Sequence, residues 1–441
     1  MVLRRGGVGR DGTWRNWAGT TVARPAHIVA PASTEEVVRT VRWAGERGLT
    51  VRAAGTGHSF SATAATDGVL VLPHRMAGIR AVDRAAGTVT VGAGTPLWRL
   101  NRELAAAGLS LTNMGDIAAQ TVAGAVSTGT HGTGRDSGSL AAQVTGMELV
   151  LADGRVLRCS ASEHPEVFRA ARIGLGALGV VTQITFAVEP LFLLRAREEG
   201  MRLDRVLADF DQLRAENEHF EFYWFPHTDR CLTKRNNRSP GPVAPLPTAR
   251  RWFDDELLSN GVFGAVCALG RAVPATVPLT ARLTSRALGT REYVDLPYRV
   301  FTSPRRVRFV EMEYALPVEA AVPALRALRR AVERSSLRVG FPVEVRTTPG
   351  DDIPLSPATG RRSVHIAVHV YRGTPYQAYF TLAERIMTEH EGRPHWGKLH
   401  SRDARHLARA YPEFAAFRAL RDRLDPQRRF TNAYTRRVLG A

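Results

Sequence analysis

The sequence predicts an α+β protein with two domains and a C-terminal segment. Its 441 residues exceed the usual size of a single domain. Short strands and helices alternate through residues 1–190, and the composition changes after Pro190. Strands separated by helices recur between residues 307 and 390, an order typical of an antiparallel sheet covered by helices. We therefore expect domains at residues 1–190 and 191–385, followed by a segment at 386–441.

The elements of the first domain follow from the spacing of apolar residues and from turn residues. Ser33 and Glu36 resemble a capping box, and the apolar residues behind them predict a helix that ends at Gly48. Further along we expect strands at residues 50–54, 88–91 and 180–188, helices at 96–108 and 163–172, and a hairpin at 148–158 that turns at Asp153-Gly154.

The second domain has a similar mixture of elements. Residues 220–225 are aromatic, and residues 238–250 contain four prolines, which predicts a loop or linker. We expect strands at 307–314, 341–347 and 363–371 and helices at 317–335 and 376–390. The tail from Asp403 is expected to be helical and then irregular.

The composition excludes several classes of protein. The hydrophobic content of 44% and the charged content of 23% are those of a globular chain. No stretch approaches the roughly 18 consecutive apolar residues of a membrane span, and the basic residues 1–16 precede no apolar run. The three cysteines are too widely spaced for a disulfide framework or a zinc site. We expect a protein of a reducing compartment, the cytoplasm, with no transmembrane segment and no secretory signal.

The net charge of +18 raises the question of nucleic-acid binding. Nucleic-acid arms gather their charge into runs, whereas the arginines here are scattered along the chain, so we expect no nucleic-acid partner. All but two of the 60 basic residues are arginine, and the lysines are Lys234 and Lys398. In such a chain a lysine marks a position where the compact ammonium of lysine is preferred to the planar guanidinium of arginine.

One glycine pattern imitates a dinucleotide-binding fingerprint. Gly174-x-Gly176-x-x-Gly179 matches the string, but the fingerprint needs a strand before it and a helix after it. Here a helix is expected before the glycines and a strand after them. We therefore do not expect a Rossmann site.

Two further glycine-rich segments are candidates for ligand binding. Residues 53–61 follow a strand directly, and their backbone amides can form an anion-binding nest with His58 beside it. The alternative is an ordinary glycine turn with an exposed histidine. Residues 115–134 are small, hydroxylated or glycine, and they can line a long cofactor although they cannot pack a core.

Three motifs together resemble a known family. They are the Gly-His-Ser-Phe that begins at Gly57, the Ala-Gly-Ala-x-Ser-Thr-Gly-Thr-His-Gly-Thr-Gly at 123–134, and the Arg-Pro-His-Trp-Gly-Lys at 393–398. In this order they resemble the aldonolactone oxidoreductases of the vanillyl-alcohol-oxidase flavoprotein superfamily. The resemblance implies a two-domain FAD-binding fold of that type, with an antiparallel-sheet cap domain. The segment 386–441 would then complete the active site and pack back on the FAD domain.

The resemblance also implies the cofactor site. FAD would be attached covalently through His58, which fixes the ring and raises its potential. The residues implied to bind FAD are Ala53, Ala54, Gly55, Thr56, Gly57, His58, Ser59, Asp116, Thr121, Gly124, Ala125, Val126, Ser127, Val180 and His395.

The cap domain offers the candidate catalytic residues. Glu344 and Arg346 share a face of their predicted strand, so the carboxylate and the guanidinium project together. The alternative is a surface ion pair. By resemblance this pair binds the substrate hydroxyls and Lys398 contacts the substrate. Lys234 lies in a polar stretch where we expect exposure rather than catalysis.

Two histidines of the cap also share a strand face. His365 and His369 could bind a metal, but we expect no third ligand near them and therefore no metal site.

The resemblance implies FAD-dependent oxidation of the C2 hydroxyl of a gulono-, galactono- or arabinono-1,4-lactone by hydride transfer to flavin N5. The alternative is an alditol or other carbohydrate oxidase on the same fold. Those enzymes have threonine where Ala367 falls and serine where Asp116 falls, which favours the lactone. Oxygen, a quinone or a cytochrome would accept the electrons. Association of the cytoplasmic protein with a membrane stays open.

Overall fold

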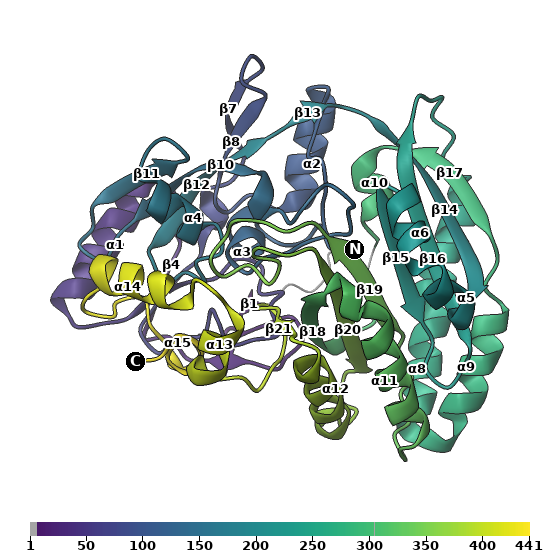
Figure 1. The fold of residues 1–441 in the computed structure, drawn as a ribbon. Helices are drawn as coiled ribbons and strands as arrows, with labels where there is room; N and C mark the ends of the chain where they lie inside the picture. Colours follow the sequence, from purple (N-terminus) through teal and green to yellow (C-terminus); the bar gives the residue numbers. More distant parts are fainter. Residues whose placement is uncertain (1–6, 304) are drawn as a thin grey trace.

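The computed structural model describes residues 7–303 and 305–441. The first six residues of the basic N-terminal stretch, in which we expected no signal, lie outside the described residues. Figure 1 shows the N-terminal part of the chain on the left together with the C-terminal helices, and the part built around one large sheet on the right.

Two sheets form the centre of the N-terminal part, beside a small sheet of β1 (Gly7–Val8), β2 (Trp14–Arg15) and β3 (Val22–Ala23) and the pair of β9 (Leu109–Ser110) with β13 (Glu189–Pro190). The smaller of the two central sheets is parallel and has the order β4 (His27–Val29), β6 (Val69–Val71), β5 (Val51–Ala53). The larger is antiparallel, with the order β11 (Val156–Ser160), β10 (Val144–Val150), β12 (Val180–Ala187), β8 (Thr88–Gly92), β7 (Ile79–Asp83). Its helices are α1 (Thr34–Glu46), α2 (Leu97–Ala106), α3 (Val122–Ser127) and α4 (Pro165–Ala171).

Local signals in the sequence explain these elements. Ser33 caps α1 by accepting from the Glu36 N–H at 3.3 Å, and the Glu36 carboxylate accepts from the Ala32 N–H at 2.8 Å. The reciprocal bond therefore reaches one residue further back than in a capping box. Gly48 follows with a φ of +64°, which ends the helix. α4 precedes the Gly174–Gly179 turn and β12 follows it, so the context expected to exclude a Rossmann site is confirmed.

The second part is built on an eight-stranded antiparallel sheet. Its order is β17 (Arg291–Asp295), β14 (Leu193–Arg202), β16 (Arg230–Ser239), β15 (His219–Trp224), β19 (Val343–Thr348), β20 (Ser363–Tyr371), β18 (Phe309–Pro317), β21 (Arg393–Pro394). The helices packed with this sheet include α5 (Leu203–Ala208), α6 (Phe210–Glu216), α11 (Ala321–Glu333) and α12 (Gln377–Glu389). The antiparallel cap sheet expected from the sequence is confirmed.

The two faces of this sheet differ in polarity. In β19, Val343 and Val345 belong to the hydrophobic core that includes residues of α11 and α12. Glu344 and Arg346 alternate with them and project from the opposite face. That face is turned toward the N-terminal part, because Arg346 lies 3.7 Å from Asp116, and Glu313 on the same face bonds to His131. We call it the charged face of the cap.

Two features of residues 230–290 differ from the expectations. Lys234 lies in the strand β16 and not in an exposed polar loop. The chain after the prolines of residues 240–247 is helical, with α7 (Thr248–Trp252), a π-helical stretch (Phe253–Val262), α8 (Phe263–Ala272) and α9 (Val277–Arg286). Several of their apolar residues are not part of the core, since Leu257, Leu269, Leu279 and Leu283 are 39–60% exposed, so an apolar residue in this segment does not mark a buried position.

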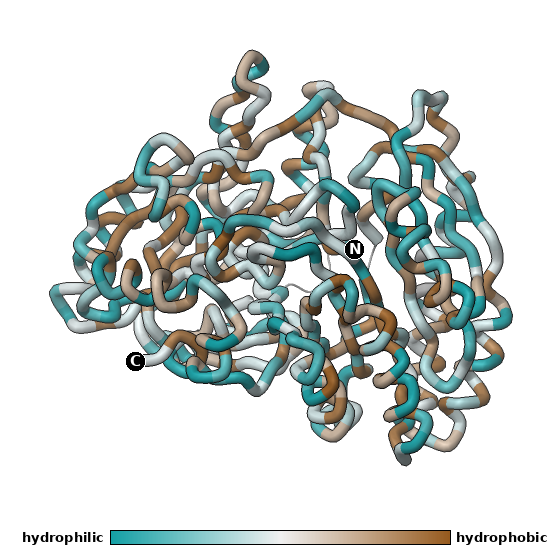
Figure 2. The backbone as a smooth tube through the Cα atoms, viewed as in Figure 1, coloured by the Kyte–Doolittle hydropathy of each residue, from teal (hydrophilic) through white to brown (hydrophobic). Residues whose placement is uncertain are grey.

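The C-terminal helices pack on the N-terminal part. They are α13 (Ala404–Ala410), α14 (Phe414–Leu424) and α15 (Ala433–Leu439). Leu407, Phe417 and Val438 share one hydrophobic core with Val89 and Leu100. Figure 2 shows brown and teal residues interleaved along the backbone, and within residues 7–303 and 305–441 no helix is long and apolar enough to cross a membrane.

Candidate active site

A cavity in the N-terminal part is lined by the glycine segments of the sequence. We call it the glycine-lined cavity. Its walls include Ala53, Gly55, Thr56, Gly57, His58, Ser59, Thr121, Gly124 and Ser127. A second cavity shares Trp14, Gly55, Thr56, Pro73 and Thr121 with it, so the two are contiguous along this shared wall. Neighbouring cavities lined by glycines and hydroxyl side chains suit a long cofactor.

The backbone of residues 55–57 can approach a ligand closely. A Cβ on Gly55 would lie 2.0 Å from the Thr121 Oγ1, and Gly57 has a φ of +70°. Within the described part of the chain, no protein acceptor faces the backbone N–H groups of Gly55, Thr56 and Gly57. Successive unpaired amides in a concave wall form an anion site, which fits the pyrophosphate of FAD.

Arg52 fixes a further part of the wall of this cavity. Its buried guanidinium donates to the carbonyls of Leu175 at 2.6 Å, Gly176 at 3.0 Å and Phe430 at 2.7 Å, and it also donates to the Thr63 carbonyl. Burial lowers the pKa of Arg52 to about 10, which still leaves it charged at neutral pH. The Gly174–Gly179 turn therefore borders the cavity through Arg52, although it is no dinucleotide fingerprint.

His58 lies in the wall of the glycine-lined cavity beside an aromatic side chain. The Trp17 ring is stacked on the imidazole with the ring centroids 5.6 Å apart and the planes inclined by 27°. The backbone N–H of Trp17 donates to the Gly57 carbonyl at 2.7 Å, which holds Trp17 beside the His58 segment. The histidine is therefore positioned by its neighbours and is not a freely exposed turn residue.

The remaining residues expected to bind FAD lie elsewhere. Ala54 lines the contiguous cavity. Ala125 and Val126 of α3 and Val180 of β12 are buried in hydrophobic cores, while Gly179 and Val181 on either side of Val180 line the cavity. Asp116 and His395 contact the cap, as described below. The sequence motif locates the segment but does not resolve which of its side chains face inward.

Arg346 is the centre of the charged face of the cap. Its Nη2 lies 2.6 Å from the Glu344 carboxylate, and its Nε donates to Glu221 at 2.7 Å. The Tyr223 hydroxyl donates to Glu344 at 2.6 Å. Glu344 is 6% exposed and Arg346 is 7% exposed, so the alternative of a surface ion pair is wrong.

Asp116 links the two parts of the chain at this point. Its carboxylate accepts from Arg305 at 2.7 Å and lies 3.7 Å from Arg346. Burial would raise the pKa of the Asp116 carboxyl, but Arg305 and Arg346 together hold it well below its usual value. Asp116 is therefore an ionised bridge between the domains and does not line the glycine-lined cavity.

The pKa of Glu344 is shifted in the opposite direction to that of Asp116. Burial raises the pKa of its carboxyl above the usual value, and the nearby carboxylates of Asp116 and Glu221 add to this shift while Arg346 opposes it. A carboxyl with a raised pKa in a buried site is a candidate for proton transfer or for a hydrogen bond to a substrate hydroxyl.

Lys398 lies where the C-terminal motif meets the His58 segment. Its Nζ is 2.5 Å from the Glu311 carboxylate and 3.7 Å from that of Glu313, and it lies 5.4 Å from the centre of the Phe60 ring. The Phe60 N–H donates to the Gly397 carbonyl at 2.7 Å. The first and third sequence motifs are therefore in direct contact.

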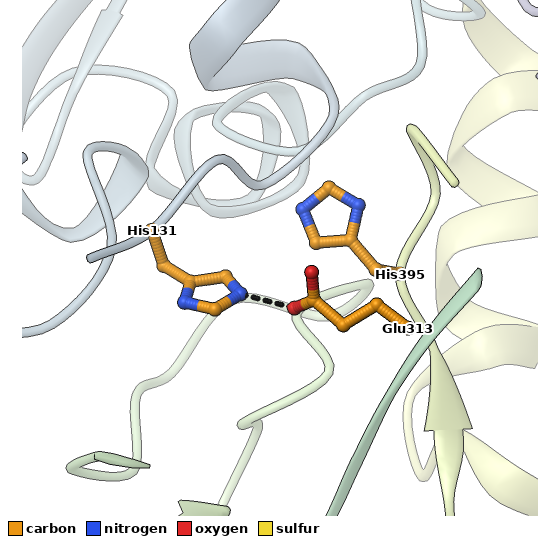
Figure 3. Close-up of side chains that lie close together, drawn as sticks. All are labelled: His131, Glu313 and His395. Atoms are coloured by element: carbon orange, nitrogen blue, oxygen red, sulfur yellow. Dashed lines mark hydrogen bonds and ion pairs between the residues drawn. The ribbon is translucent and has the colours of Figure 1, made fainter. Parts of the chain in front are cut away.

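The second motif joins the same cluster through His131. In Figure 3 His131 and His395 both lie beside the carboxylate of Glu313, and the dashed line marks its bond with the His131 Nε2, which is 2.5 Å long. The His131 Nδ1 faces the Gly132 carbonyl at 2.8 Å. Both ring nitrogens of His131 therefore face oxygen atoms, one of the Glu313 carboxylate and one of the Gly132 carbonyl. Burial would raise the pKa of Glu313, but His131 and His395 hold it well below its usual value.

His395 is neutral in this arrangement. Its Nδ1 accepts from the Gly397 N–H at 3.0 Å, so its Nε2 carries the proton and donates to the Gly129 carbonyl at 3.1 Å. Burial lowers the pKa of His395 to about 4, with Lys398 and His131 contributing. Both nitrogens are engaged, which leaves no lone pair for a metal beside Glu313.

The expectation that no further ligand lies near His365 and His369 is wrong. The neighbouring strand β18 places Glu313 3.4 Å from His365 and Glu311 3.4 Å from His369. Each of these histidines also bonds through its other nitrogen, to Thr348 Oγ1 at 2.9 Å and to the Pro342 carbonyl at 3.1 Å respectively. The Nδ1 of His365 nevertheless has no hydrogen-bond partner within the described residues, and burial lowers the pKa of His365 to about 3, so a neutral imidazole lies beside Glu313 rather than an ion pair.

Several members of this site were not singled out in the sequence. They are Glu221, Tyr223, Arg305, Glu311, Glu313 and His131. A signal was available in Phe220-Glu221-Phe222 and in Val310-Glu311-Met312-Glu313, where carboxylates alternate with apolar residues inside strands. An apolar strand with charges on one face indicates a buried polar site on that face.

Buried neutral histidines predict acid sensitivity. Burial, with Arg437 and Arg402 nearby, lowers the pKa of His400 to about 3. On acidification the imidazole of His400 is protonated at a higher pH in the unfolded chain than in the folded protein. The neutral, buried His400 therefore contributes stability that is present above pH 6.5 and is lost as the pH falls toward 3. Thermal unfolding should show a loss of about 2 kcal/mol from His400 alone between pH 7 and pH 5. His400→Gln should reduce that loss and His406→Gln, at an exposed histidine, should not. Equal pH profiles for both variants would contradict the assignment.

Comparison with known proteins agrees with the site. A D-arabinono-1,4-lactone oxidase family model matches residues 184–438, and an FAD binding domain model matches residues 25–160. L-gulono-1,4-lactone dehydrogenase of Mycobacterium tuberculosis is 42% identical over 97% of this chain and 99% of its own. L-gulonolactone oxidase of Bos taurus is 34% identical over 96% and 98%, respectively.

Solved structures agree with the fold. A solvent-stable cholesterol oxidase superposes with a TM-score of 0.84 at 19% identity, over 98% of both chains. Cholesterol oxidase from B. sterolicum superposes with a TM-score of 0.81 at 19% identity, over 97% of this chain and 96% of its own. The expected FAD-binding fold and the family resemblance are thus confirmed. The chain belongs to the D-arabinono-1,4-lactone oxidase family and is an FAD-dependent oxidoreductase.

Proposed function

We propose that this protein oxidises the C2 hydroxyl of a sugar-acid 1,4-lactone. The observation that carries the proposal is the meeting of the glycine segments with the charged face of the cap. The Phe60–Gly397 bond brings Lys398 beside the His58 segment, and Asp116 brings Arg346 to the same interface. The relatives named after gulono- and arabinono-lactones support this substrate class.

The roles of the residues follow from their charges and contacts. When bound, FAD supplies the acceptor for a hydride at N5 of its ring. Glu344 and Arg346 present an acceptor and a fork of donors to the hydroxyls and the carbonyl of a lactone. Lys398 places a positive charge where the C2 oxygen loses its proton, and the carboxylates of Glu311 and Glu313 keep that charge fixed. A nearby base or a water molecule takes the proton.

Attachment of FAD to His58 is part of the proposal. His58 faces the glycine-lined cavity, and the Trp17 stack limits the orientations of its ring. A covalent bond at this position would hold the ring of the cofactor at the end of the cavity that adjoins the cap.

The runner-up is an alditol or other carbohydrate oxidase. Open-chain polyols need additional hydroxyl partners, and two positions that would supply them do not. Ala367 lies opposite both Glu344 and Glu313 in the sheet and contributes only a methyl group. Asp116 is engaged by two arginines. Both observations favour the lactone.

Substrate preference tests the proposal. Gulono-, galactono- or arabinono-1,4-lactone should give a higher kcat/KM than xylitol or sorbitol, because the additional hydroxyls of the polyols find no free partner at Ala367 or Asp116. The measurement is a steady-state assay of each compound with an artificial electron acceptor and, separately, with oxygen. A higher kcat/KM for the polyols would contradict the lactone and support the runner-up.

A further inference from the structure

An apolar cavity lies in the cap domain beneath α8 and α9. Its volume is about 280 Å³, and the rings of Phe225, Phe263, Phe341 and Tyr379 contribute to its walls. We propose that this cavity is the binding site of a quinone that accepts the electrons of the reaction. The source of the electrons in this proposal rests on the proposed function. The location of the quinone site rests on the cavity alone.

Aromatic rings in contact connect this cavity with His58. Trp17 is stacked on His58 at 5.6 Å, and its ring centroid lies 5.4 Å from that of Phe309. Phe309 in turn lies 5.4 Å from Phe341 and 5.1 Å from His369, which both line the cavity. Two rings therefore separate the histidine of the glycine-lined cavity from the wall of the apolar cavity.

The chemistry of the walls selects a planar apolar ligand with a carbonyl group. An apolar cavity of about 150 Å³ holds benzene, so 280 Å³ has room for a larger ring system. A sugar lactone would lose its hydrogen bonds with water among these rings. Arg271, at the wall and 5.8 Å from the centre of the Tyr371 ring, offers a donor to a quinone carbonyl oxygen.

The helices above the cavity expose apolar side chains at their surface. Leu269, Val273, Leu279 and Leu283 are 46–60% exposed. Each is next in sequence to a residue that lines the cavity, namely Gly270, Pro274, Thr280 and Thr284. A lipophilic molecule therefore meets exposed apolar side chains on the helices that line the cavity.

The redox balance is complete with a quinone. The lactone loses the hydrogen on C2 and the hydrogen of the C2 hydroxyl, and becomes the 2-keto compound. The two electrons and two protons that leave it convert the quinone into a hydroquinone. No other oxidant or reductant is needed.

The test uses 2-methyl-1,4-naphthoquinone and the purified oxidised holoenzyme. Ala281 lines the cavity on α9, and Ala287 lies just beyond the end of α9 outside it. Equilibrium dialysis should show saturable binding to the wild type, a Kd at least about tenfold higher for Ala281→Phe because the ring fills the cavity, and an unchanged Kd for Ala287→Phe. Reoxidation of the reduced enzyme by this quinone should slow in Ala281→Phe alone, while ferricyanide reoxidises all three proteins equally.

Photolabelling keeps the proposal testable if Ala281→Phe fails to fold. An azido derivative of the naphthoquinone should attach to residues 263–284 or 336–341 of the wild type. Labelling elsewhere, absence of saturable binding, or equal Kd values for the two variants would overturn the proposal. Dialysis needs no lactone, so a failure of the proposed function, seen as no flavin reduction by any lactone, remains distinguishable from a failure of this site.

Discussion

His58→Ala is expected to abolish the covalent flavin completely. The imidazole of His58 faces the glycine-lined cavity and is fixed by the Trp17 stack, and no other histidine lines that cavity within the described residues. Acid-precipitated wild-type protein should be yellow, and the precipitated variant should be colourless with its FAD in the supernatant. The backbone amides of residues 55–57 remain, so the native variant should still bind FAD reversibly.

The control for this experiment is His27→Ala. His27 is an exposed histidine of the same domain that packs on Trp43, away from the cavity. This variant should keep its flavin through acid precipitation. A colourless precipitate from fully loaded wild-type protein would contradict a covalent bond to the flavin. A yellow precipitate from His58→Ala would show that the bond is formed by another residue.

Lys398→Met should slow reduction of the flavin by the lactone about 100-fold. The substitution keeps the length of the side chain and removes the only group of the C-terminal motif that carries a full positive charge beside Glu311. Loss of one positioned charge or donor at a developing oxyanion costs about 10²–10³ in rate. Rapid mixing of the anaerobic enzyme with substrate measures this step directly. Lys398→Arg should recover little, because the planar fork does not replace a point charge.

The same substitution should also destabilise the protein. Glu311 is 3% exposed, and removal of the ammonium leaves its buried carboxylate with only His369, 3.4 Å away, beside it; loss of one partner of a buried pair costs about 3–5 kcal/mol. The double variant Lys398→Met with Glu311→Gln should regain much of the thermal stability without regaining the rate. Lys234→Met, at the other lysine and beside Glu221 and Glu198, should reduce its flavin at close to the wild-type rate. Slower flavin reduction in Lys234→Met than in Lys398→Met would contradict the placement of the active site at Lys398.

The elements with explicit boundary signals could be predicted from the sequence. The strand at 363–371 coincides with β20, and the helix at 376–390 differs from α12 by one residue at each end. β16 was missed because only Cys231 and Leu232 of its ten residues are apolar, and Lys234 faces the carboxylates of Glu221 and Glu198 rather than a hydrophobic core. Neither periodicity nor a turn residue reveals such a strand.

The candidate site could be predicted only as far as its motifs extend. The family resemblance implied that the C-terminal motif completes the site, and the bond between the Phe60 N–H and the Gly397 carbonyl joins it to the His58 segment. The neighbours of Arg346 depend on strand register, since Glu221 lies directly opposite it on β15 only in the observed pairing. Register between strands more than 100 residues apart is set by the packing of the whole sheet, which no local signal encodes.

The most direct test of the account is an isotope measurement on the proposed reaction. The lactone that the enzyme prefers is prepared with deuterium on C2 and, separately, with deuterium on C3. Each is mixed with anaerobic enzyme, and the loss of flavin absorbance is followed in time. The account predicts a primary isotope effect with the C2 label and none with the C3 label. A full effect at C3, or reduction of the flavin at the same rate with every label, would contradict oxidation at the C2 hydroxyl.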